Sequence, residues 1–305
     1  MTAAPAGGPR SVYSAARPRY RSRVPFATIA GSPLLPETRP IELYYRDSTR
    51  GVGPGVGAAA GPGAGADPRG RAPLLVLHGG WGYGFYPFDA QIAALPEHRV
   101  VIPDRTGYGR SPRIAALPAR FHHAAAAEHE ALLDALGIER CAIWGHSDGA
   151  VIAAIMALRR PERITAIILE ALHVDRGKPR SRAFFTMMAD DPDGFGPRIA
   201  AKLAAEHGDD YWRTILRAGG RAWLDIAAAP GDDFFEHRLH AIAVPVLVLH
   251  GADDPRTEPG ELDRVARELP GATIHRIAGA DHAPHSERGA SAEASTVAAR
   301  FLRAM

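Results

Sequence analysis

Short apolar runs alternate with stretches of helical pattern along most of this chain, and this alternation limits the fold more than any other feature. The runs Leu74–Leu77 and Val100–Ile102 contain no polar residue, as is typical of strands buried on both faces. Further strands are predicted at 41–45, 141–144, 166–169, 246–249 and 273–277. Helices are predicted between most of them, at 89–95, 124–136, 150–159 and 261–269. Alternation at this spacing predicts right-handed β-α-β units, and therefore an α/β protein with a mainly parallel sheet and helices on both faces.

The alternation is interrupted between His173 and about Leu239, where the pattern indicates several short helices. Residues 173–239 are therefore predicted to form a helical cap over the strand ends, where open α/β sheets place their ligands. The core would then comprise residues 24–172 and 240–305.

Two segments of biased composition lie outside this pattern. Residues 1–23 are rich in Ala, Pro, Gly and Arg, and we expect a disordered basic tail. Residues 50–71 are nearly all Gly, Ala and Pro, and strands flank them closely, so we expect a flexible insertion within the core.

Charge and hydropathy exclude several kinds of partner. The 305 residues include 36 basic and 34 acidic ones, and this small excess argues against a nucleic-acid partner. No apolar run approaches the ~20 residues that cross a bilayer, so no membrane partner is expected. The single cysteine, Cys141, lies in a predicted buried strand and has no partner for an intramolecular disulfide. A cytoplasmic location is the resulting expectation.

The motif that indicates chemistry is Gly145-His146-Ser147-Asp148-Gly149, between a predicted strand and a small, apolar helix. A serine at such a strand-to-helix turn stands exposed at the top of a sheet, and flanking glycines let strand and helix approach each other. Ser147 is therefore the candidate nucleophile.

With this elbow, the chain from about Val24 onward resembles the serine-nucleophile branch of the α/β-hydrolase fold superfamily. The segments Glu170–His173 and Ala280–His285 are similar to the valacyclovirase-like (biphenyl hydrolase-like) esterases. The resemblance implies an α/β-hydrolase fold with an eight-stranded, mainly parallel sheet and an inserted cap.

An acid and a base must activate the serine, and in this fold they follow it in the order acid, then histidine. The resemblance assigns the acid to Asp254, three residues after Gly251, with the adjacent Asp253 as the alternative. It assigns the base to His282, with His285 as the alternative. Asp281 stands where the family has a glycine, and its charge is expected to raise the pKa of the histidine.

An oxyanion hole needs two preorganised N–H donors. The backbone amide of Asp148 is the first candidate, and Gly80 in the loop His78–Trp81 is the second, with Trp81 as the alternative. His78 is expected to hold this loop, and residues 104–111 are expected to be scaffold. Trp81 and Asp148 are also the predicted substrate contacts: the Asp148 carboxylate would either cap the following helix or pair with a cationic group on the substrate.

These residues together predict a serine hydrolase that cleaves a small carboxylic ester, or a related acyl bond, through an acyl-enzyme on Ser147. The alternatives are a carbon–carbon bond, lactone or small-peptide hydrolase with the same triad, and a non-catalytic ligand receptor of the same fold. No phosphate loop, dinucleotide fingerprint or helical zinc motif is present, so neither a cofactor nor a metal is expected.

Overall fold

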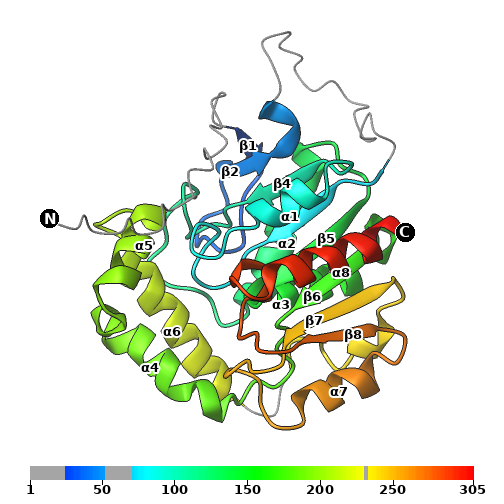
Figure 1. The fold of residues 1–305 in the computed structure, drawn as a ribbon. Helices are drawn as coiled ribbons and strands as arrows, with labels where there is room; N and C mark the ends of the chain where they lie inside the picture. Colours follow the sequence, from blue (N-terminus) through cyan, green and yellow to red (C-terminus); the bar gives the residue numbers. More distant parts are fainter. Residues whose placement is uncertain (1–24, 52–70, 230–232) are drawn as a thin grey trace, which may run out of the picture.

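The computed structural model describes residues 25–51, 71–229 and 233–305 (Figure 1). The predicted tail, 1–23, lies outside the described residues, as do residues 52–70 of the predicted insertion. Both of these predictions therefore stay predictions.

The described part of the chain forms one eight-stranded sheet in the order β1-β2-β4-β3-β5-β6-β7-β8. The pairs β1/β2 and β2/β4 are antiparallel and the other pairs are parallel, which confirms the predicted α/β fold and its mainly parallel sheet. The strands are β1 (Phe26–Ile29), β2 (Ile41–Asp47), β3 (Leu74–Leu77), β4 (Val100–Pro103), β5 (Cys141–His146), β6 (Ile164–Glu170), β7 (Val246–Gly251) and β8 (Thr273–Ile277). The strand β1 was not predicted from the sequence.

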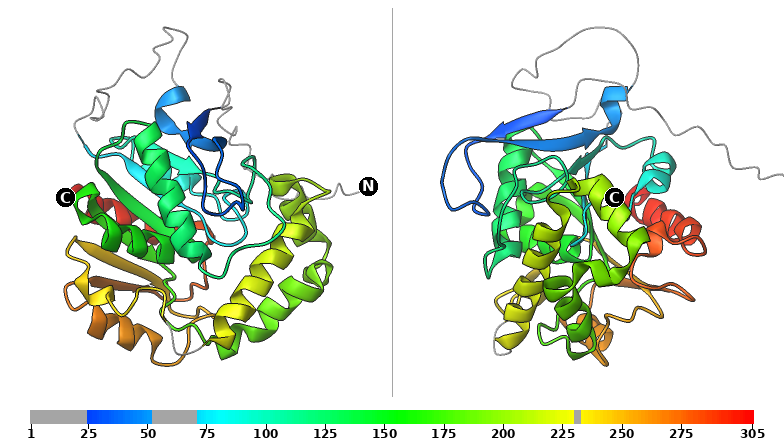
Figure 2. Two further views of the ribbon diagram at one scale, coloured as in Figure 1. Left: turned by 180° about the vertical axis from the view of Figure 1, so that it is seen from behind. Right: turned by 90° about the vertical axis from the view of Figure 1, so that its left-hand side faces the viewer.

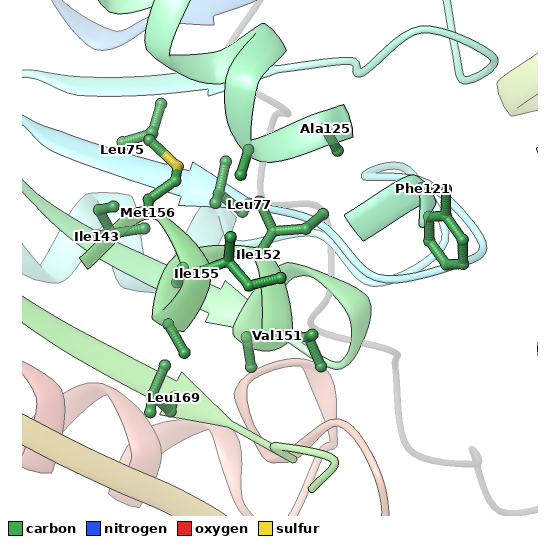
Figure 3. Packing of buried hydrophobic residues seen from close by; sticks show 14 of the residues in the cluster. Leu75, Leu77, Phe121, Ala125, Ile143, Val151, Ile152, Ile155, Met156 and Leu169 are labelled. Atoms are coloured by element: carbon green, nitrogen blue, oxygen red, sulfur yellow. The ribbon is translucent and has the colours of Figure 1, made fainter. Parts of the chain in front are cut away.

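Helices cover both faces of the sheet, as expected (Figures 1 and 2). One face carries α2 (Phe121–Ala135), α3 (Asp148–Arg159) and α7 (Glu261–Glu268), and the other carries α1 (Asp89–Ala94) and α8 (Ser291–Arg303). Because successive strand residues point to opposite faces, each strand supplies both layers of the core. Leu77 packs toward Ile152 and Leu75 toward Met156, both on α3 (Figure 3), whereas Leu74 and Val76 belong to the layer under α8.

Between β6 and β7 the chain forms α4 (Arg182–Asp190), α5 (Pro197–His207) and α6 (Trp212–Ala228), which fall within the predicted cap. Figure 1 shows α4 and α6 side by side at one end of the sheet, and these two helices pack together over much of their length. Gly220 allows this close approach, because a Cβ there would lie 2.5 Å from the backbone nitrogen of Ala189. Within the described residues, no helix is both long and apolar enough to span a bilayer.

Candidate active site

Ser147 lies between the end of β5 and the start of α3, with φ 56° and ψ −119°. A non-glycine residue with this backbone conformation is uncommon and costs about 1–3 kcal/mol, so the surrounding packing must hold it. The neighbouring glycines permit that packing. A Cβ on Gly145 would lie 2.1 Å from the carbonyl oxygen of Gly149, and a Cβ on Gly149 would lie 2.1 Å from that of Leu77.

The structure brings the three predicted triad side chains together. The Ser147 Oγ lies 3.0 Å from His282 Nε2, and His282 Nδ1 lies 2.8 Å from Asp254 Oδ2. Asp254 and His282 are both buried, each on the loop that follows a strand, β7 and β8 respectively. This geometry is that of a serine, a base that can take its proton, and an acid that fixes the tautomer of the base.

The structure does not bring the two alternatives into this arrangement. Asp253 is exposed, and its backbone N–H donates to the carbonyl of Ala280. His285 is buried, but its Nδ1 lies 2.8 Å from Glu170 Oε1 and its ring stacks on Phe88.

The electrostatic environment keeps the acid ionised and the base neutral. Burial alone would raise the pKa of Asp254, but His282 and the backbone N–H of Arg256 outweigh burial and lower it. Burial lowers the pKa of His282, the charge of Arg256 lowers it further, and Asp254 opposes both. The expectation that Asp281 raises this pKa is wrong, because Asp281 is exposed and burial governs the direction of the shift.

The loop after β3 places Gly80 and Trp81 beside the nucleophile, in the wall of the same pocket as Ser147 and Asp148. His78 holds this loop, as expected: its Nδ1–H donates to the carbonyl of Gly79, and its Nε2 accepts the backbone N–H of Arg105. No hydrogen bond within the described residues engages the backbone N–H of Gly80, Trp81 or Asp148. These amides are therefore available to a substrate oxygen.

The Asp148 carboxylate lies buried at the start of α3, and three side chains donate to it. Arg105 Nη2 lies 3.2 Å from Oδ2, while His122 Nε2 and Trp223 Nε1 each lie 3.1 Å from Oδ1. All three donors lie outside α3. A substrate ammonium group would have to be a fourth donor, so the amine-pairing role stays a prediction.

The pocket around Ser147 has apolar walls from both the sheet loops and the cap. Its ring-bearing and thioether wall residues are Trp81, Tyr86, Phe184, Phe185, Met188 and Trp223. The Trp81 ring stacks on that of Phe184 at 5.5 Å between centroids, so the oxyanion loop contacts α4 directly. Other apolar residues of the cap are buried away from the pocket, as Trp212 and Phe235 are.

Four polar residues of the pocket were not predicted to be site residues: Tyr86, His146, His173 and Arg256. His173 follows β6, and its Nε2 lies 3.5 Å from the Ser147 Oγ. Burial lowers the pKa of His173 well below its usual value, so the ring is neutral. His173 could have been identified from its position in the sequence, because it is the first polar residue after the buried strand β6. In the described part of the chain, no group of three His, Cys, Asp or Glu residues has a metal-binding arrangement.

Comparisons with known proteins agree with this architecture. Residues 72–221 match the model of the alpha/beta hydrolase fold family. RutD of Pseudomonas savastanoi pv. phaseolicola, to which carbamate hydrolysis is ascribed, is 30% identical over 234 residues, which cover 70% of this chain and 87% of RutD. The human serine hydrolase BPHL is 26% identical, over 71% of this chain and 75% of BPHL. A thermophilic esterase from Thermogutta terrifontis superposes with a TM-score of 0.64 at 21% identity, covering 92% of this chain and 98% of the esterase.

The chain belongs to the α/β-hydrolase family, as the elbow and strand pattern predicted. It is a hydrolase whose relatives include esterases and a serine hydrolase.

Proposed function

We propose that this protein is a serine hydrolase that cleaves a small carboxylic ester, or a closely related acyl bond such as a carbamate, through an acyl-enzyme on Ser147. The observation that carries the proposal is the continuous hydrogen-bonded chain Ser147–His282–Asp254, which opens into an apolar pocket. Carbamate hydrolysis is ascribed to RutD, and another relative, from Acinetobacter calcoaceticus, is an esterase/perhydrolase, which supports the choice of reaction.

In the first half of the reaction, His282 Nε2 takes the Ser147 proton as the Oγ attacks the acyl carbon. Asp254, bonded to His282 Nδ1, stabilises the imidazolium that forms. The backbone N–H of Asp148, with that of Gly80 or Trp81, receives the developing oxyanion. His282 then protonates the leaving group. In the second half, His282 removes a proton from water as the water attacks the acyl-enzyme, and it returns that proton to the Ser147 Oγ as the acid is released.

The cap, residues 173–239, is proposed to close the acyl pocket from above. Phe184 and Phe185 on α4 and Trp223 on α6 line the space in front of Ser147. Burial of apolar substrate groups against these rings stabilises the complex by about 25 cal/mol per Å² of area removed from water.

The test is hydrolysis of p-nitrophenyl acetate and butyrate by the pure protein and by Ser147→Ala, together with labelling by a fluorophosphonate probe. We expect turnover and labelling in the wild type, and a loss of turnover by several orders of magnitude in Ser147→Ala, whose fold should be intact. A wild-type protein that neither turns over these esters nor reacts with the probe would support the receptor alternative. A Ser147→Ala variant that keeps more than a few per cent of the wild-type turnover would refute the acyl-enzyme.

A further inference from the structure

Arg256 is a cation in the pocket wall that the reaction described above does not use. It lies on the loop after β7, two residues beyond Asp254, and its backbone N–H donates to Asp254 Oδ1 at 2.9 Å. Its guanidinium carbon lies 4.0 Å from the centre of the Phe184 ring on α4. The side chain therefore reaches from the triad loop across the pocket wall to the cap.

Among the described residues, no carboxylate lies within 4.0 Å of the Arg256 guanidinium, although its side chain is half-buried. The other cations near the site are paired. Arg105 meets Asp148 at 3.2 Å, and Lys178 meets Glu261 at 2.5 Å. A partly buried charge without a counter-ion is costly, so an unpaired guanidinium in a pocket favours an anionic ligand.

The groups around Arg256 do not neutralise its charge. The Phe184 ring offers a cation–π contact, and the Tyr86 hydroxyl is a neutral neighbour. Tyr86 lines the same pocket as Arg256, and burial raises the pKa of its hydroxyl, which therefore keeps its proton. The two carboxylates nearest the nucleophile are already engaged, Asp148 by Arg105 and Asp254 by His282.

From this arrangement we propose that the substrate carries a carboxylate, which Arg256 binds with the Tyr86 hydroxyl as a second donor. The inference rests on the proposed acyl hydrolase and adds the charge of its substrate. A guanidinium presents two parallel N–H groups that match the two oxygens of a carboxylate. Because the same pocket holds Ser147, the carboxylate and the scissile bond belong to one small molecule, such as a half-ester of a dicarboxylic acid.

The experiment compares anionic and neutral esters of matched size at pH 8, where His282 is neutral. One pair carries the charge in the acyl group: mono-4-nitrophenyl glutarate and 4-nitrophenyl pentanoate. The other carries it in the leaving group: the butyryl esters of 4-hydroxybenzoate and of 4-hydroxybenzamide. Each ester is assayed with the wild type, Arg256→Gln, Arg256→Lys and the control Arg276→Gln, which removes an equal charge from an exposed position on β8.

We expect the wild type to have a higher kcat/KM for the anionic ester than for the neutral ester in at least one pair. That pair shows whether the substrate carries its carboxylate in the acyl group or in the leaving group. Arg256→Gln should lower the anionic-to-neutral ratio about tenfold or more, since a hydrogen bond to a charged group contributes that much. Arg256→Lys should keep part of the preference, and Arg276→Gln should keep all of it. Equal ratios in the wild type and Arg256→Gln for both pairs would overturn the proposal.

A binding experiment separates failure of this inference from failure of the proposed reaction. Titration calorimetry of glutarate into Ser147→Ala, and into the same variant carrying Arg256→Gln, needs no turnover. We expect glutarate to bind Ser147→Ala at least tenfold more tightly than the double variant. If both bind it equally, Arg256 does not select a carboxylate, whether or not the enzyme hydrolyses esters.

Discussion

Asp148→Asn tests how much of the site depends on one buried ion pair. In the native protein the Arg105 side chain is 1% exposed, and its Nη2 lies 3.2 Å from Asp148 Oδ2. Arginine does not lose its proton inside proteins, so the substitution leaves a buried charge without its partner. Removing one member of such a pair costs about 3–5 kcal/mol. We take about 3 kcal/mol, because Arg105 keeps its bonds to the carbonyls of His78 and Gly79.

For a chain of this size, that loss corresponds to a fall in Tm of roughly 6–12 °C. The assay is thermal unfolding followed by circular dichroism at pH 7. The control is Asp193→Asn, which breaks an exposed pair with Arg213 and should leave the Tm nearly unchanged. The double variant Arg105→Met/Asp148→Asn should lose less stability than the sum of its single variants, because the stranded charge is gone. An Asp148→Asn protein that melts within about 2 °C of the wild type would refute the reasoning.

Three further predictions concern the acid, the elbow and the buried histidines. Asp254→Asn should lower kcat by about a thousandfold or more, and Asp253→Asn only slightly; the reverse ranking in an esterase assay would make Asp253 the acid. Gly149→Ala should abolish or greatly reduce the yield of folded protein, because the added Cβ would lie 2.1 Å from the carbonyl oxygen of Leu77 in β3. The control Gly271→Ala should fold normally, because no atom lies within 4 Å of the Cβ that it adds. Burial lowers the pKa of His146 to about 3, so the unfolded chain binds a proton below about pH 6.5 that the native protein excludes. The Tm should therefore fall between pH 7 and pH 5, and a Tm that rises over this interval would contradict the assignment.

Most of the sheet was predictable because its strands are buried on both faces. Such strands are continuous apolar runs, and the predicted range 74–77 coincides with β3. The range 273–277 coincides with β8, although only Ile277 of that strand is buried. The strand β1 was missed because only alternate residues of its four are buried, and so short an alternation does not stand out beside a biased tail. Its pairing with β2 is a tertiary contact.

The three candidate triad residues could be predicted for a different reason: Ser147 lies in a local motif, and the resemblance to the family assigned Asp254 and His282. The surroundings of the nucleophile could not. The three donors to Asp148 lie 43, 26 and 75 residues away from it, on the loop after β4, on α2 and on α6. No local pattern marks such partners, so the sequence could offer a helix cap or a substrate contact for Asp148 but could not identify the three side chains that donate to its carboxylate. Arg256 was not predicted for the same reason. Whether an arginine has a counter-ion depends on the positions of all neighbouring acidic side chains, which only the tertiary structure gives.

The position of Arg256 also couples substrate charge to the strength of the base. The charged groups that act on His282 are Asp254, which raises its pKa, and Arg256 and Lys178, which lower it. Lys178 forms an ion pair with Glu261, whereas Arg256 has no counter-ion among the described residues until a substrate carboxylate binds. Binding of that carboxylate would offset the effect of Arg256, so the pKa of His282 should be higher in the complex than in the free enzyme.

The acid limb of the pH profile of kcat reports the pKa of His282 in the complex, and the acid limb of kcat/KM reports it in the free enzyme. With the preferred anionic ester we therefore expect the acid limb of kcat to lie at higher pH than that of kcat/KM, and with its neutral partner the two limbs should coincide. If the acid limbs of kcat and kcat/KM differ by the same amount with the neutral ester, the charge of the substrate does not change the pKa of His282 through Arg256.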